Sequence, residues 1–142
     1  MVLSIHTYGD KVLRELNKIV KLNRQKEIKE LYTNMFDTLL AYGGYGLSAP
    51  QVGHNLNLFV IKTQNFQEIF INPEIKLEGL SIQVKEGCLS FPDLEFPVNR
   101  RERVQIKFYD RNWTYRLVEY KDLLSIVVQH EYDHLKGRLI ID

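Results

Sequence analysis

The residues best suited to chemistry lie near the C-terminal end of the chain, in the segment His130-Glu131-Tyr132-Asp133-His134. If this segment is helical, its two histidines are four positions apart on one face and can bind one metal ion from a single side. Glu131 then lies on an adjacent face, within reach of a water molecule at that metal. Two metal ligands and a carboxylate base are the groups that metal-assisted hydrolysis requires. The segment therefore predicts a hydrolytic metal site rather than a helix that contains two histidines by chance.

A catalytic metal is usually held by three side chains, so this pattern lacks one ligand. Some zinc peptidases supply it in the pattern H-E-x-x-H-x-x-G-x-x-H, but Ile140 occupies the last position here. The few residues after His134 include one carboxylate, Asp142. The third ligand is therefore expected upstream, and Cys88, the only cysteine, is the best candidate. The alternative for a single cysteine is a small buried apolar residue.

Length and composition suit one soluble domain over residues 1–142. Of the 142 residues, 44% are hydrophobic and 26% are charged, and the net charge is +1. These values are ordinary for a globular protein, and they provide no strong field for binding nucleic acid or a membrane surface. No apolar run approaches the roughly 20 residues that span a bilayer, and the N-terminus lacks the pattern of a secretion signal. A single cysteine excludes an internal disulfide and suits a reducing compartment, so the cytoplasm is the expected location.

The hydrophobic pattern predicts the elements that must position these residues. Residues 26–42 repeat apolar positions at three- and four-residue steps, which predicts an amphipathic helix that ends at Gly43-Gly44. Strand patterns occur at 56–62, 68–72, 80–85 and 104–109, and residues 113–120 are expected to return from a hairpin loop at 110–112. Asp122 is expected to cap a last helix over residues 123–136, which Gly137 ends.

Because these helices flank the strands without regular alternation, the expected fold class is α+β rather than a doubly wound parallel sheet. Its expected form is a set of mostly antiparallel strands around a C-terminal metal-binding helix, with an N-terminal amphipathic helix. The stretch Arg100-Arg101-Glu102-Arg103 is interpreted as a solvated strand edge rather than a phosphate-binding patch. The chain contains no internal repeat or low-complexity linker, which supports a single domain.

Three separated motifs occur together in this chain. They are Gly44-Tyr45-Gly46-Leu47-Ser48-Ala49-Pro50-Gln51, Glu86-Gly87-Cys88-Leu89-Ser90 and Gln129-His130-Glu131-Tyr132-Asp133-His134-Leu135. Their order and separations, together with the opening Tyr8–Arg14 segment, resemble those of the peptide deformylases, and the likeness spans nearly the whole chain. Any one motif alone would be only suggestive, whereas the three together are highly specific.

The resemblance implies a metal-dependent hydrolase that removes the N-formyl group from the N-terminal formylmethionine of nascent proteins and releases formate. It implies that Cys88, His130 and His134 hold one divalent metal ion. Fe(II) is the metal expected natively, and zinc, nickel or cobalt could replace it in purified protein because the ligand set accepts all of them. Glu131 would act first as general base and then as general acid.

The resemblance also implies two hydrogen-bond donors for the oxyanion of the tetrahedral intermediate, namely the side-chain amide of Gln51 and the backbone N–H of Leu89. The alternative for Gln51 is an amide that only ties down its own turn. An extended nascent peptide is expected to pair with exposed backbone as an added strand. The residues expected to contact the substrate are Gly44, Tyr45, Gly46, Val84, Glu86, Gly87, Leu123 and Val127. Ile126 occupies a further pocket position, although plain core is at least as good an interpretation of it.

The expected partners are nascent N-formylmethionyl peptides, with possible transient contact to the ribosome, and the chain is expected to be a monomer without nucleic-acid sequence recognition or membrane contact.

Tyr45 and Ser48 stand where the family usually has an aliphatic residue and an alanine, and Glu95 stands where many bacterial members have an arginine. The short C-terminus resembles that of compact bacteriophage deformylases, which would act in the host cytoplasm, and an engineered truncation would look the same. Two alternatives remain: a metallopeptidase, which the thiolate ligand argues against, and an inactive metal-binding or ribosome-associated module, which would not need Glu131.

Overall fold

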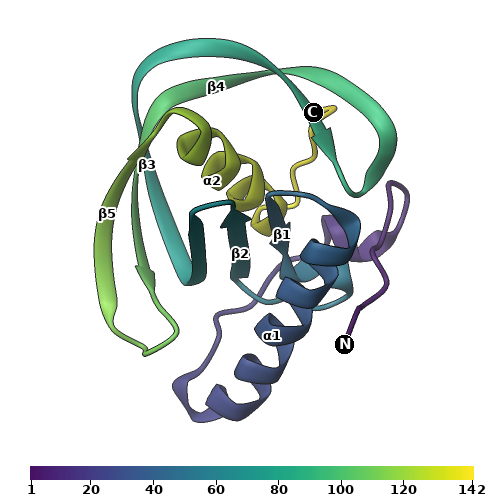
Figure 1. The fold of residues 1–142 in the computed structure, drawn as a ribbon, viewed down its shortest axis with the longest axis vertical. Helices are drawn as coiled ribbons and strands as arrows, with labels where there is room; N and C mark the ends of the chain where they lie inside the picture. Colours follow the sequence, from purple (N-terminus) through teal and green to yellow (C-terminus); the bar gives the residue numbers. More distant parts are fainter.

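Helices α1 (Gln25–Tyr42) and α2 (Asp122–Leu135) cover opposite faces of the same pair of strands (Figure 1). The computed structural model describes all residues from 1 to 142. Five antiparallel strands form one sheet in the order β1-β2-β3-β4-β5. Their bounds are Gly46–Ser48, Leu58–Thr63, Phe66–Cys88, Phe91–Tyr109 and Tyr115–Lys121. Three short 3₁₀ turns occupy Lys11–Arg14, Leu22–Arg24 and Ala49–Val52.

Strand β2 separates two hydrophobic cores. Leu58 and Val60 pack with the apolar face of α1, whereas Phe59 and Ile61 pack with α2. All four side chains are fully buried. Successive side chains of a strand point to opposite faces, so an uninterrupted apolar run belongs in a strand that is covered on both sides. This arrangement places α2, with the histidine motif, inside the molecule.

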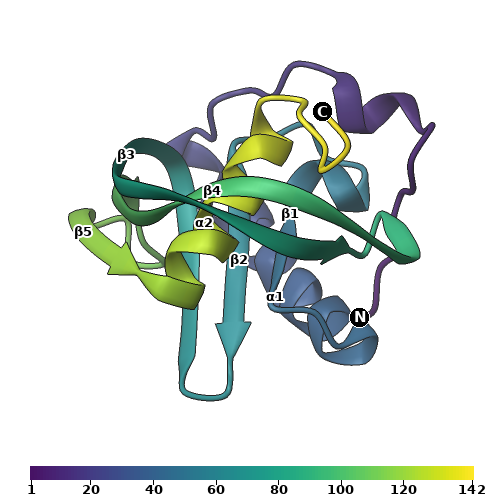
Figure 2. The ribbon, with the colours of Figure 1, turned by 90° about the horizontal axis from the view of Figure 1, so that it is seen from above.

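The long hairpin of β3 and β4 arches over α2 (Figures 1 and 2). Its pairing shifts register between Ile71 and Glu74, between Glu78 and Ser81, and between Gly87 and Cys88. Such bulges bend a ribbon and increase its twist, so the hairpin can curve around the helix instead of extending past it. The segments 68–72 and 80–85, which were expected to be separate strands, are therefore parts of β3.

Pro73 lies inside the first of these register shifts, where the ladder does not need its missing N–H group. Asn72, just before it, has a φ of +51°. The proline therefore bends the strand without ending it, which is why the prediction of a strand end at this point is wrong.

The predicted helices are both present, with one error at a terminus. Gly43 ends α1 in a left-handed conformation (φ +82°) and donates its N–H to the carbonyl of Leu39, as expected for a C-terminal glycine. The prediction that Asp122 caps the second helix is wrong. Asp122 is the first residue of α2, Lys121 holds the cap position, and no side chain makes a capping bond there.

Other strand boundaries also differ from the prediction, since β2 is Leu58–Thr63 rather than residues 56–62 and β4 begins at Phe91 rather than at residue 104. The returning strand begins at Tyr115 rather than at residue 113, because Asp110 Oδ1 accepts the N–H groups of Asn112 and Thr114 and extends the turn. The short strand β1 was not predicted from the sequence. The α+β class with mostly antiparallel strands is confirmed, and none of the helices has both the length and the apolar character needed to cross a membrane.

Candidate metal centre and substrate cavity

Helix α2 and the end of β3 bring three potential ligands together. His130 and His134 lie one turn apart on α2, and their Nε2 atoms are 3.3 Å apart. Cys88, the last residue of β3, lies beside them, with its Sγ atom 3.4 Å from His134 Nε2. The three ligand atoms all lie within 4.8 Å of one another. The structure thus joins a thiol from the middle of the chain to two imidazoles near its end.

The spacing of these atoms fits a metal ion. A tetrahedral metal with bonds of about 2.0–2.1 Å places two nitrogen ligands roughly 3.3 Å apart. The Nε2 atoms of His130 and His134 already have this separation. One sulfur and two imidazole nitrogens suit zinc and the late first-row metals, and they leave a position open for water or substrate.

The charges around this cluster favour a cation. Burial by itself lowers the pKa of His130, but the charge of Glu131 and the contacts with Cys88 and Glu86 outweigh it and raise the pKa to about 10. Burial and the charge of His130 hold the pKa of His134 well below its usual range, so this imidazole is neutral and suited to ligation. The same anionic surroundings that hold a proton on His130 would stabilise a metal ion.

Glu131 lies next to the three ligands and is almost fully buried. Its Oε2 atom is 3.9 Å from His130 Nε2, and its Oε1 atom is buried without a hydrogen-bond partner. Burial, the largest influence, raises the pKa of Glu131 to about 7. A carboxylate with a pKa near neutrality can both accept and return a proton under physiological conditions.

A buried ion-pair network orients His130. Glu86 Oε1 lies 2.7 Å from His130 Nδ1, and Arg100 donates to both Glu86 oxygens at 2.6 and 2.8 Å. Arg100 also donates to Asp133 Oδ2 at 2.6 Å. Burial alone would raise the pKa of Glu86, but the hydrogen bonds from Arg100 and His130 lower it to about 2. Because the ionised Glu86 accepts a hydrogen bond from the Nδ1–H of His130, Nε2 is the ring nitrogen that faces Cys88 and His134.

The network changes two expectations from the sequence. Arg100 is 6% exposed, so the interpretation of its stretch as a solvated strand edge is wrong for this residue. A signal was available, because Arg100 has the same strand parity as the buried Val104 and Ile106. Glu86 borders the cavity, as a substrate contact would, but its carboxylate also accepts hydrogen bonds from Arg100 and His130, a role that the sequence did not predict.

Gln51 faces both its own turn and the ligand cluster. Its Oε1 atom accepts hydrogen bonds from the backbone N–H and the hydroxyl of Ser48, at 2.9 and 3.0 Å. Its Nε2 atom donates to Ser90 Oγ and lies 3.5 Å from Cys88 Sγ. The amide therefore ties down its turn and also presents an N–H donor next to the cysteine. The backbone N–H of Leu89 has no acceptor within the protein.

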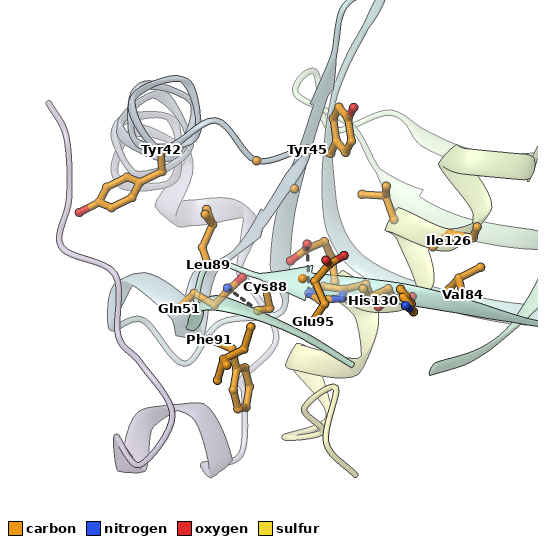
Figure 3. Close-up of a pocket in the computed structure, with 18 of the residues that line it drawn as sticks. Tyr42, Tyr45, Gln51, Val84, Cys88, Leu89, Phe91, Glu95, Ile126 and His130 are labelled. Carbon is orange, nitrogen blue, oxygen red and sulfur yellow. Dashed lines mark hydrogen bonds and ion pairs between the residues drawn. The ribbon is translucent and has the colours of Figure 1, made fainter. Parts of the chain in front are cut away.

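A cavity of about 780 Å³ opens directly above these groups (Figure 3). It is bordered by all the residues expected to contact the substrate and by five of the six expected metal-binding or catalytic residues: Gly44, Tyr45, Gly46, Val84, Glu86, Gly87, Leu123, Val127, Gln51, Cys88, Leu89, His130 and Glu131. Ile126 also lines it, whereas His134 lies beneath the surface of the cavity wall. Tyr45 stands at the rim, and Val127 serves both as cavity wall and as part of the α2 core. Six further residues that were not expected there also line the cavity, as does Glu95: Tyr42, Lys85, Phe91, Pro92, Asp93 and Leu94.

A helix that carries two histidines and a buried glutamate, with a cysteine beside them under an open cavity, is typical of the metal-dependent hydrolases. The model of the polypeptide deformylase family matches residues 2–142. The chain is 42% identical to a peptide deformylase of Karelsulcia muelleri, over all of this chain and 78% of the relative. A Thermotoga maritima peptide deformylase structure superposes with a TM-score of 0.95 at 36% identity, covering 100% of this chain and 97% of the other. A probable peptide deformylase from Synechococcus phage S-SSM7 gives a TM-score of 0.93 at 36% identity, covering 99% and 98%. The chain belongs to the polypeptide deformylase family.

Proposed function

We propose that this chain removes the N-formyl group from the formylmethionine of nascent peptides, with Cys88, His130 and His134 as the ligands of one divalent metal ion. The observation that carries the proposal is the convergence of one Sγ and two Nε2 atoms within 4.8 Å, next to the buried carboxylate of Glu131. Membership of the deformylase family supports the activity, and the geometry supports the assignment of roles to residues.

The reaction replaces the C–N bond of the formamide by a C–O bond from water, giving formate and a free amine. A divalent metal in this site would supply Lewis-acid polarisation of water and of the formyl oxygen. Glu131 takes a proton from the attacking water and later delivers it to the departing nitrogen. Gln51 Nε2 and the Leu89 N–H donate hydrogen bonds to the oxyanion, and each such donor is typically worth about 2.7–4 kcal/mol in the transition state.

The cavity walls suit an extended peptide with an apolar first side chain. Strand β1 lies at the edge of the sheet, paired only with β2, so its other edge can receive a substrate strand next to Gly44 and Gly46. Such pairing uses hydrogen bonds to the main chain of the peptide, so it is compatible with many substrate sequences. Val84, Leu123 and Val127 form the apolar wall that would accept the methionine side chain.

Fe(II) is the proposed native metal, on the basis of the family resemblance, and zinc, nickel or cobalt would find the same donors. We further propose that the chain acts as a monomer on peptides that emerge from the ribosome. The absence of a long-range charge bias in the composition supports recognition of the peptide itself rather than of nucleic acid.

The test uses protein purified without oxygen, with metal content measured per chain and formate release followed on formyl-Met-Ala-Ser. We expect one metal ion per chain and formate release without cleavage of internal peptide bonds. Glu131→Ala should retain the metal and lower kcat by about 10²- to 10⁴-fold, because a general base is lost while every ligand stays. Glu119→Ala, on the exposed surface of β5, is the matched control and should match the unsubstituted protein.

Metal-loaded protein that releases no formate would overturn the proposal and would favour a metal-binding module. Cleavage of internal peptide bonds would favour a metallopeptidase. A Glu131→Ala variant with undiminished turnover would remove Glu131 from the mechanism.

A further inference from the structure

Gly46 of β1 lies directly against the carboxylate of Glu131 on α2. A Cβ atom built on Gly46 would lie 2.6 Å from Glu131 Oε2, 2.9 Å from Cγ and 3.0 Å from Cδ. Real Cβ atoms essentially never approach other heavy atoms below 3.0 Å. Any side chain at this position therefore requires either the glutamate or the strand to move.

Glu131 has little else to hold its orientation. Its side chain is 4% exposed, its Oε1 atom has no hydrogen-bond partner, and its nearest charged partner is His130 Nε2 at 3.9 Å. No other protein group therefore donates a short hydrogen bond that would orient this carboxylate. The carboxylate is instead oriented by the shape of the surrounding wall, and Gly46 forms the part of that wall that lies against it.

We propose that Gly46 is a positioning residue, whose missing side chain leaves the slot that holds the Glu131 carboxylate beside the ligand cluster. This role differs from the substrate contact expected of Gly46, because it acts through Glu131 rather than through the peptide. The catalytic part of the inference rests on the proposed function, whereas the packing part does not.

Gly44, two residues earlier, provides the contrast. A Cβ atom there would meet only the side-chain ends of Leu89 and Leu39, at 3.2 and 3.3 Å. At these distances the neighbouring side chain needs to give way by only a few tenths of an ångström, whereas at Gly46 the glutamate or the strand must move, so Gly44 does not have the same role. Gly44→Ala is therefore the matched control for stability and metal content.

The first experiment measures thermal unfolding of the metal-free protein in a double-mutant cycle. Gly46→Ala should lower Tm by about 3 °C or more when Glu131 is present, because the methyl group and the carboxylate compete for one space. In the Glu131→Ala background the same change should leave Tm unchanged or raise it, since the methyl group fills the space that the glutamate vacated. Equal Tm shifts in both backgrounds would overturn the proposal, whatever the activity of the protein.

The second experiment measures steady-state kinetics and metal content. Gly46→Ala should lower kcat by at least about tenfold with a smaller change in KM and with full metal content, because only the base is displaced. Added to Glu131→Ala, it should not lower the residual rate further. A further loss in that background would show that Gly46→Ala acts by blocking the peptide, and it would overturn the positioning role. If the unsubstituted chain releases no formate, the proposed function fails. The double-mutant unfolding cycle would still test whether Gly46 leaves the space that holds the Glu131 carboxylate.

Discussion

At the scale of single residues, the site is organised by charges that are buried together. Arg100 donates to both oxygens of Glu86 and to Asp133, and Glu86 in turn accepts a hydrogen bond from the Nδ1–H of His130. A charge removed from water is tolerated only when partners replace its hydration. The network therefore places a permanent carboxylate behind one proposed metal ligand, where it sets which imidazole nitrogen faces the cavity.

Replacing Glu86 by glutamine keeps the size of this group but removes its charge. We expect the metal affinity to fall about 10- to 100-fold, because the outer partner of a ligating histidine sets its orientation and basicity. Competition with a chelator of known affinity measures the change, with Glu119→Gln on exposed β5 as the control. An unchanged affinity would show that Glu86 serves the fold rather than the metal.

At the scale of the elements, helix α2 is fastened to β4 by hydrogen bonds as well as by packing. Gln129 Oε1 accepts the backbone N–H of Arg101 at 3.0 Å, and its Nε2 atom donates to the carbonyl of the same residue at 2.8 Å. The Ser125 hydroxyl donates to that carbonyl too. The side chain thus pairs with β4 much as a neighbouring strand would, and it sets how deeply the histidines lie beneath the hairpin.

Gln129→Leu should lower the free energy of unfolding by about 2 kcal/mol or more. The leucine matches the glutamine closely in size, but it leaves the Arg101 N–H without its partner and weakens the bonding of the carbonyl. Urea unfolding of the metal-free protein measures the loss. Gln83→Leu, on an exposed position of β3, serves as the control and should change stability by less than about 0.5 kcal/mol. Equal stabilities of the two variants would contradict this account of the attachment.

At the scale of the whole molecule, the two cores depend on the same strands. Ile69 of β3 packs with α1, and its neighbour Phe70 packs with α2, as Val60 and Phe59 do on β2. Neither core can lose its helix without exposing one face of strands that the other core needs. The two halves are therefore coupled through shared backbone.

This coupling predicts a single cooperative unfolding transition for the metal-free chain. Trp113, the only tryptophan, packs against the α1 core, so its fluorescence reports one side, whereas far-UV circular dichroism reports both helices. The two signals should change with the same urea midpoint, as two-state unfolding requires. Separate midpoints would indicate two independently unfolding parts and would count against a single domain.

The features that the sequence determined by itself are those that depend on local spacing. The i, i+4 histidines with their glutamate, the apolar stripe of α1 and its terminal glycine all follow from the geometry of a single helix. Cys88 was reached by elimination, since the sequence contains no other thiol. The family resemblance added Gln51 and Leu89, and the structure places both beside the cysteine at the cavity.

Only the tertiary structure decided the features that depend on contacts between distant segments. The bulged hairpin forms a single strand where the sequence pattern indicates two, and it buries Arg100 against Glu86. The packing of β1 against α2 places Gly46 against Glu131 across 85 positions of sequence. The type of a residue and its neighbours in the sequence do not specify which strand will pair with its own strand. Pairing of strands and burial of charges are set by the assembled sheet, because each requires a partner that local spacing does not specify.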